Sequence, residues 1–287
     1  MTHATTSTDD PSVWRKSGKA DGQCHGLDLR AGRGAPIVMA PLTPLAGDRN
    51  RPLARIGKRL RGTIDRLIAS SSLVANDPVL DMRVFGWTAQ LRDQWQAIRD
   101  EAQRVVNGKG APSLATISPD HRAIAAEDTW RSFFLWGYGF PVAENIAQCP
   151  QTKALVERIP GLNSAFFSIL APGAHIPPHR GVTKGLITCH LGLMVPRDGD
   201  ARMRIGERVV RWAEGETLVY DDTYDHEVWN DSNDVRVVLL IQFERPLRNP
   251  GKWFADLFLS LLRRSAFVQD ARRNMRSWNA AVHHHQA

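Results

Sequence analysis

The chain has 287 residues, of which 43% are hydrophobic and 23% charged, and this composition excludes fibrous, collagen-like and wholly disordered proteins. Its net charge of +7 suits a nucleic acid, an anionic membrane surface or acidic small molecules as a partner, without choosing among them. Cys24, Cys149 and Cys189 are too few and too far apart for a disulfide framework or a cysteine zinc site, which favours a reducing cytosol.

Two features of the sequence bear on membranes and secretion. No apolar run reaches the roughly 20 residues that cross a bilayer, so we expect no spanning helix. The N-terminus lacks a basic region followed by an apolar one, so we expect no secretory signal.

The first part of the chain divides into two segments. Residues 1–48 are rich in Gly, Pro, Ser, Thr and Ala, and we expect a poorly ordered leader. Six of the residues from Arg49 to Arg61 are basic, and apolar residues recur at helical spacing from Leu53 to Ile68. Residues 49–84 are therefore predicted to be a basic amphipathic helical segment, either packed on the main domain or lying on a membrane surface.

The middle of the chain changes from helical to β texture. An apolar stripe predicts a helix over about 88–106, ended by Asn107-Gly108, and a shorter helix is expected over 150–159. Residues 128–140 are aromatic and expected to be extended. Short β-rich runs separated by turn sequences then follow one another with no helix between them, which predicts an antiparallel sandwich or barrel. These runs are 164–171, 187–195, 201–205, 207–212, 216–220, 226–229 and 235–243.

The tail after Pro250 combines an apolar face with arginines. The apolar residues lie between Trp253 and Leu262, and five arginines follow between Arg263 and Arg276. Two interpretations are open. The tail is either a helix docked on the sheet or at a dimer seam, or an interfacial helix on anionic lipid.

Two histidines are candidates for a metal site. His179 lies in a Pro/Gly-rich loop that leaves a strand, with His175 before it in the same loop, and His226 begins a later strand. Strand ends that are distant in sequence meet at the mouth of a barrel, and two imidazoles suit a divalent transition metal such as iron. Each histidine taken alone is more often a satisfied polar residue.

Arg236 lies in the otherwise apolar run 235–243, where a buried guanidinium needs a partner. If 226–243 is a hairpin that turns near Ser232, with residue 228 opposite 236, His226 and Arg236 share a face at about 7–8 Å. A slip of one residue would put them on opposite faces. The guanidinium would then be placed to bind the carboxylate of a metal-chelating 2-oxo acid. The alternative is a salt bridge to a buried Asp or Glu.

Several segments resemble the aspartyl/asparaginyl β-hydroxylase family of Fe(II)- and 2-oxoglutarate-dependent oxygenases, which includes bacterial lipid A and ornithine lipid hydroxylases. The resemblance covers about 85–247. It implies a mainly β (α+β) fold, a double-stranded β-helix (jelly roll) with flanking helices, and an oxygenase domain over 85–248. With the segments described above, the chain then divides into the leader 1–48, the segment 49–84, this domain and the tail 249–287. The segments that carry the resemblance are SAFFSILAPGAHIPPHRG, CHLGLMVP, WAEGETLVYDDTYDHEVWNDSNDVRVVLL, DTWRSFFLW and CPQTKALVERIPG.

The resemblance also implies a cofactor set and residue roles. The cofactors are Fe(II), 2-oxoglutarate as cosubstrate and O2. His179 and His226 are the implied metal ligands and catalytic residues. Arg236 binds the distal carboxylate of 2-oxoglutarate, and Ser168 and His190 help to hold this cosubstrate.

The sequence departs from related oxygenases at two positions. Gly181 stands two residues after His179, where many oxygenases of this fold carry an acidic ligand, which implies a site with two histidine ligands only. Thr188 stands where animal members carry arginine. Residues left open as a carboxylate ligand are Asp221, Asp222 and Asp225, and residues left open as a replacement for the arginine are Arg180 and Lys184.

The function expected from these features is Fe(II)/2-oxoglutarate-dependent hydroxylation of an unactivated C–H bond, with a peptidyl or amino-acid β-carbon as the first substrate class. Hydroxylation of a membrane lipid acyl chain (lipid A or ornithine lipid) is the close alternative, and a non-catalytic cupin-like metal-binding module is a further one. The expected partners are a peptide, amino-acid or lipid substrate and a membrane surface, without a specific nucleic acid, because no recognition motif occurs. The expected location is cytoplasmic, with a peripheral position at the inner face of the membrane as the alternative.

Overall fold

The computed structural model describes residues 62–108, 111–118, 124 and 128–284. The leader predicted over 1–48 and the basic stretch 49–61 lie outside these residues. Within the rest of the predicted helical segment, residues 62–70 are α-helical, and the chain then forms the short strand β1 (Val79–Leu80) and the 3-10 helix η1 (Met82–Val84).

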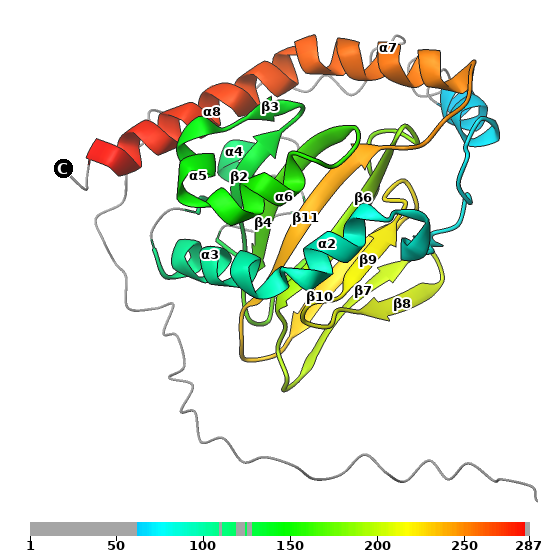
Figure 1. The fold of residues 1–287 in the computed structure, drawn as a ribbon. Helices are drawn as coiled ribbons and strands as arrows, with labels where there is room; N and C mark the ends of the chain where they lie inside the picture. The colour runs from blue at the N-terminus through cyan, green and yellow to red at the C-terminus, as the bar shows by residue number, and fades with distance from the viewer. Residues whose placement is uncertain (1–61, 109–110, 119–123, 125–127, 285–287) are drawn as a thin grey trace, which may run out of the picture. The chain divides into compact units, whose positions relative to one another are not determined.

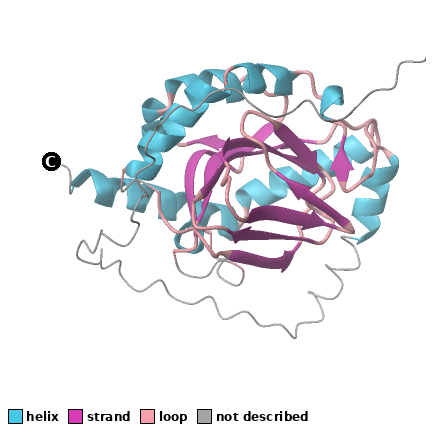
Figure 2. Ribbon diagram, turned by 90° about the horizontal axis from the view of Figure 1, so that it is seen from below, coloured by secondary structure: helices cyan, strands magenta, loops and turns pink. Residues whose placement is uncertain are grey.

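Two antiparallel sheets form the centre of the described residues, and Figure 2 shows the helices outside them. The seven-stranded sheet has the order β1-β9-β6-β11-β4-β2-β3, and the four-stranded sheet has the order β5-β10-β7-β8. The strands after β1 are β2 (Trp130–Gly137), β3 (Phe140–Pro141), β4 (Leu162–Leu170), β5 (His175–His179), β6 (Leu186–Met194), β7 (Asp200–Ile205), β8 (Arg208–Arg211), β9 (Thr217–Tyr220), β10 (His226–Asp231) and β11 (Arg236–Glu244).

The strand order is that of a jelly roll. Strands β4 to β11 form two facing sets of four, β9-β6-β11-β4 and β5-β10-β7-β8, and the chain passes repeatedly from one set to the other. This is a double-stranded β-helix. The fold class predicted from the sequence, mainly β with flanking helices, is confirmed.

Strand β11 shows why the sequence reads as a continuous apolar run. Its alternate residues Val237, Leu239 and Ile241 pack into one core with the helices, whereas Val238 packs into a second core between the sheets. A strand that is buried on both faces loses the apolar–polar alternation of a half-exposed strand. Polar residues on such a strand therefore point into the interior of the domain.

Helices cover the outer face of the seven-stranded sheet. Helix α3 packs on β6 and on α6, and its buried residues Ile98, Ala102 and Val105 join the core on that side. The predicted helix over 88–106 is interrupted at Gln94, whose φ of −115° and ψ of 20° are not helical. The helices on this side are α2 (Trp87–Asp93), α3 (Trp95–Asn107), α5 (Ala143–Gln148) and α6 (Pro150–Val156).

The tail forms two successive helices, α7 (Gly251–Arg264) and α8 (Ala266–His284), separated at Ser265 by extended backbone with ψ 152°. Figure 1 shows them running one after the other along one side of the sheets. Helix α8 contacts α4 (Leu114–Ile117), and its residues Val268, Ala271 and Met275 are buried. No helix among the described residues combines the length and the apolar character that crossing a membrane requires.

Two expectations about local structure were wrong. The segment containing His175 and His179 is strand β5 rather than a loop. Its Pro177 and Pro178 suggested a loop, but β5 is an edge strand, where a missing backbone N–H is tolerated. Residues 226–243 are also not a hairpin, because β10 belongs to the four-stranded sheet and β11 to the other.

Candidate functional site

Strands β5 and β10 bring two histidines together. His226 is the register partner of His179, and the centroids of their rings are 4.1 Å apart. The Nδ1 atom of His179 lies 2.9 Å from the Pro177 carbonyl oxygen, and that of His226 lies 2.9 Å from the Tyr224 carbonyl oxygen. A carbonyl oxygen only accepts, so each Nδ1 carries the proton and each Nε2 keeps the lone pair that a metal binds.

Both imidazoles are neutral near pH 7. Burial lowers the pKa of His179 to about 4, and the nearby His226 adds to this shift. Burial also lowers the pKa of His226. A neutral imidazole is the form that ligates a metal, so the two side chains are in the protonation state that metal binding requires.

A cavity of about 310 Å³ adjoins the histidine pair and receives residues from both sheets and from the tail helices. Its lining is largely apolar, with polar groups from both sheets. The apolar residues include Leu114, Ile124, Trp130, Phe134, Phe166, Ile176, Val228, Leu240, Leu262 and Phe267, and the polar ones include Ser168, Thr188, His190, Tyr220, Asp222, Arg236 and Gln242.

Arg236 lines this cavity from β11 and is 1% exposed. Its guanidinium lies over the Trp212 ring at 4.7 Å, and Nη1 is 3.5 Å from Ser168 Oγ. It forms no ion pair with any described carboxylate, and its Nε has no hydrogen-bond partner among the described residues. Burial lowers its pKa to about 10, so it stays charged at neutral pH. A buried, charged and unpaired guanidinium in a cavity wall is a binding group for an incoming carboxylate.

Arg236 and His226 thus line one cavity, but by another route than the hairpin. They come from opposite sheets and face each other through the interior of the jelly roll. The predicted salt bridge to a buried acid, the alternative for Arg236, is not formed with any described residue.

His190 already uses both of its ring nitrogens. The indole of Trp212 donates to His190 Nδ1 at 3.2 Å, and the hydroxyl of Tyr220 lies 3.1 Å from His190 Nε2. Burial lowers the pKa of His190 well below its usual value, so the ring is neutral and its single proton is on Nε2. Nε2 therefore donates to the Tyr220 oxygen, and the phenolic proton remains to donate into the cavity. These hydrogen bonds form a relay from Trp212 through His190 to Tyr220. The sequence did not predict a role for Tyr220, because the relay connects separate parts of the β region.

Ser168 lies beside Arg236. Its Oγ accepts a hydrogen bond from Trp130 Nε1 at 3.0 Å. Arg236 Nη1 also donates to this Oγ at 3.5 Å, so the hydroxyl accepts from two donors and its own proton is left to donate into the cavity.

Beside His179, the Asp222 side chain fills the space that a side chain at residue 181 would need. The Gly181 amide donates to the Asp222 carbonyl at 2.7 Å, and a Cβ at residue 181 would meet Asp222 Oδ1 at 2.0 Å. Asp222 Oδ2 accepts from Thr188 and Gln242 at 3.0 Å each, whereas Oδ1 has no partner among the described residues. Burial raises the pKa of Asp222 to about 6.

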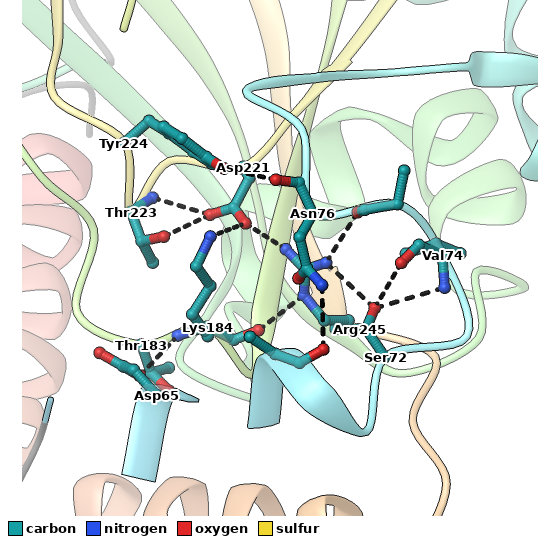
Figure 3. Close-up of polar contacts among 12 residues, drawn as sticks. Asp65, Ser72, Val74, Asn76, Thr183, Lys184, Asp221, Thr223, Tyr224 and Arg245 are labelled. Carbon is teal, nitrogen blue, oxygen red and sulfur yellow. Dashed lines mark hydrogen bonds and ion pairs between the residues drawn. The ribbon is translucent and has the colours of Figure 1, made fainter. Parts of the chain in front are cut away.

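The neighbouring aspartates are engaged elsewhere. Figure 3 shows Asp221 between Lys184 and Arg245, and Asp225 pairs with Arg204 at 2.9 Å. Lys184 is directed at Asp221 and does not line the cavity, whereas Arg180 does. The described residues contain no group of three or more His, Cys, Asp or Glu side chains that could hold a metal ion.

The residues present fit Fe(II) and a 2-oxo diacid. The cavity offers two adjacent neutral imidazoles as nitrogen donors, a glycine in place of a third protein ligand, and one buried cation without a carboxylate. The buried Arg236 is the observation that a structural metal site alone would not explain.

Comparisons with known proteins agree with the resemblance seen in the sequence. The sequence model of the aspartyl/asparaginyl β-hydroxylase family matches residues 92–246. An ornithine lipid ester-linked acyl 2-hydroxylase of Rhizobium tropici is 35% identical over 80% of this chain and 83% of its own length. The human aspartyl/asparaginyl β-hydroxylase is 30% identical over 56% of this chain, which spans 21% of the human protein. Among solved structures, a Pseudomonas putida prolyl-4-hydroxylase overlaps 55% of this chain and 88% of its own at 17% identity, with a TM-score of 0.35.

Proposed function

Because the chain belongs to the aspartyl/asparaginyl β-hydroxylase family, we propose that it is an Fe(II)- and 2-oxoglutarate-dependent hydroxylase acting on an unactivated C–H bond. In this proposal His179 and His226 hold the iron, and Arg236 binds the distal carboxylate of 2-oxoglutarate with Ser168 beside it. The observation that carries the proposal is a neutral histidine pair and an unpaired buried guanidinium in the wall of one cavity.

Iron(II) with bound 2-oxoglutarate supplies the activation of O2, in which one oxygen atom enters the C–H bond, the other enters succinate, and CO2 leaves. The protein's own residues bind and orient. The histidines present their Nε2 atoms, Arg236 sets the orientation of the cosubstrate, and the apolar walls exclude water around the target carbon. Neither a nucleophile nor a pair of acid–base carboxylates is needed.

We propose the acyl chain of a membrane lipid as the substrate class, which reverses the order expected from the sequence. The relative named as an ornithine lipid acyl hydroxylase matches most of both chains, whereas the human relative matches a fifth of its own length. The largely apolar lining of the cavity also suits an acyl chain. With this substrate the protein works at the inner face of the membrane.

A peptidyl or amino-acid β-carbon remains the second candidate. The human aspartyl/asparaginyl β-hydroxylase is 30% identical over 56% of this chain, and the stretch DDTYDHEVW at 221–229, which contains His226, resembles the peptide-hydroxylating members of the family.

The test is mass spectrometry of lipid extracts and peptides from cells that produce the protein. We expect a lipid species heavier by one oxygen atom with the wild type and with His175→Ala, an exposed histidine on the same strand as His179. The species is absent with His226→Ala. An oxygen gain confined to peptides or amino acids would favour the second candidate, and no gain in either class would contradict the proposal.

A further inference from the structure

Helix α7 has two apolar faces. One face packs on the domain, where Ala255 and Leu259 are 3% and 2% exposed. The other points to solvent, and its four large residues are between 43% and 65% exposed. These residues are Trp253, Phe254, Leu257 and Leu261.

The outward residues form one continuous stripe. Their spacing of one, four and eight positions from Trp253 places them on one side of a helix. Single exposed hydrophobic residues are ordinary, but a row of four on one helix indicates a surface that binds a membrane or another protein.

The charge around the stripe distinguishes a membrane surface from a second copy of the chain. From Arg248 to Arg276 the chain has seven Arg or Lys residues and two Asp. Arg264 and Arg276 are exposed and form no ion pair with another described residue. A second copy of the chain on this face would bring like charges together, whereas an anionic lipid surface attracts them.

The stripe also leads to the cavity. Leu261 is exposed, and the next residue, Leu262, lines the cavity, as does Phe267 at the start of α8. Val182, which is 42% exposed, lines the cavity from the loop after β5. The solvent-facing stripe of α7 and the wall of the cavity therefore meet.

We propose that α7 lies along the boundary of headgroups and acyl chains of an anionic bilayer, with Trp253, Phe254, Leu257 and Leu261 buried in it. An acyl chain then enters the cavity past Leu262 and Phe267 without passing through water. The second step rests on the proposed lipid substrate, whereas binding of α7 to the bilayer does not depend on the proposed function.

The test uses the full-length protein and sedimentation with vesicles of phosphatidylcholine alone or mixed with phosphatidylglycerol. Trp253→Gln combined with Leu257→Gln keeps helix-forming residues in α7 and removes two apolar side chains from the stripe. We expect the wild type to bind the mixed vesicles and the double variant to bind them at least about tenfold more weakly. The control is Val209→Thr on β8, where Val209 is 53% exposed, and this variant binds as the wild type does.

A second readout separates this proposal from the proposed function. Succinate formation from 2-oxoglutarate in solution is expected to be unchanged in the double variant, whereas turnover of vesicle-embedded lipid falls by about the same factor as binding. If the double variant binds the mixed vesicles as strongly as the wild type does, the proposed role of α7 is wrong, even if succinate is formed. Failure of the wild type to form succinate overturns the proposed function, and the vesicle result still decides the role of α7. If the wild type is a dimer, the double variant is a monomer and neither binds vesicles, this face is a dimer interface and the proposal is wrong.

Discussion

Gly181 and Asp222 occupy one space beside His179, because a Cβ at residue 181 would lie 2.0 Å from Asp222 Oδ1. Many oxygenases of this fold carry an acidic ligand two residues after the first histidine. Here the side-chain volume of that position is taken by a carboxylate that comes from the turn between β9 and β10. Gly181 is therefore required by packing as well as by the chemistry proposed for the site.

The first prediction tests this packing. Gly181→Ala is expected to lower the free energy of unfolding in urea by about 1–3 kcal/mol, because Asp222 must move. In the background of Asp222→Ala the same change costs less, with a coupling of about 1 kcal/mol or more. Gly86→Ala is the control, since nothing lies within 4 Å of a Cβ at that position. If Gly181→Ala lowers the free energy of unfolding equally in both backgrounds, Asp222 does not limit the space at residue 181.

Two buried arginines give the second prediction. Arg236 has no carboxylate partner among the described residues, whereas Arg245 pairs with the buried Asp221 (Figure 3). Arg236→Met is expected to raise the KM for 2-oxoglutarate at least about 100-fold while the free energy of unfolding stays within about 1 kcal/mol or rises. Arg245→Met lowers the free energy of unfolding by about 2–4 kcal/mol, because Asp221 loses a partner.

The measurements are succinate formation at varied 2-oxoglutarate and urea unfolding of each variant. A large loss of stability in Arg236→Met with an unchanged KM would show that Arg236 is a structural residue.

The third prediction concerns Tyr220. Its hydroxyl accepts from His190 and has its own proton to donate into the cavity, so Tyr220→Phe is expected to raise the KM for 2-oxoglutarate roughly tenfold. Tyr224→Phe is the matched control, because the Tyr224 hydroxyl donates to the Asn76 carbonyl, away from the cavity (Figure 3). The same KM in both variants would remove Tyr220 from the cosubstrate site.

Much of the fold could be predicted from the sequence because its strands are local features. The apolar run that contains Arg236, and the turn sequences on either side, mark β11 without knowledge of its neighbours. Residue type alone could select His179, His226 and Arg236, because a polar or charged side chain is unusual in an interior unless it binds a partner or a ligand.

Other parts depend on long-range pairing that one sequence does not encode locally. The prolines of β5 look like a loop until the strand is seen at the edge of a sheet. The assignment of β10 and β11 to different sheets is set by pairing with β5, β7, β4 and β6. The overlap of Gly181 with Asp222 and the relay from Trp212 through His190 to Tyr220 follow only from those pairings.

The fourth prediction is a loss of stability at alkaline pH. Burial raises the pKa of the Cys149 thiol from 9.0 to about 12. Well below pH 9 the thiol is protonated in the folded and in the unfolded chain. As the pH rises through 9, the unfolded chain releases a proton that the folded chain keeps, so the free energy of unfolding falls. Cys149→Ala is expected to make this fall shallower in urea titrations between pH 8 and pH 10.5. A slope equal to that of the wild type would contradict the shift.

In the proposed site, His179 and His226 hold iron beside a cosubstrate bound by Arg236. The most direct measurement is succinate formation by the purified full-length protein with iron(II), ascorbate, 2-oxoglutarate and O2. We predict iron-dependent succinate from the wild type and from His175→Ala, and a rate at least about tenfold lower from His179→Ala and from His226→Ala. If the wild type forms no iron-dependent succinate, or if His179→Ala and His226→Ala both form it at the wild-type rate, these histidines do not hold a catalytic iron.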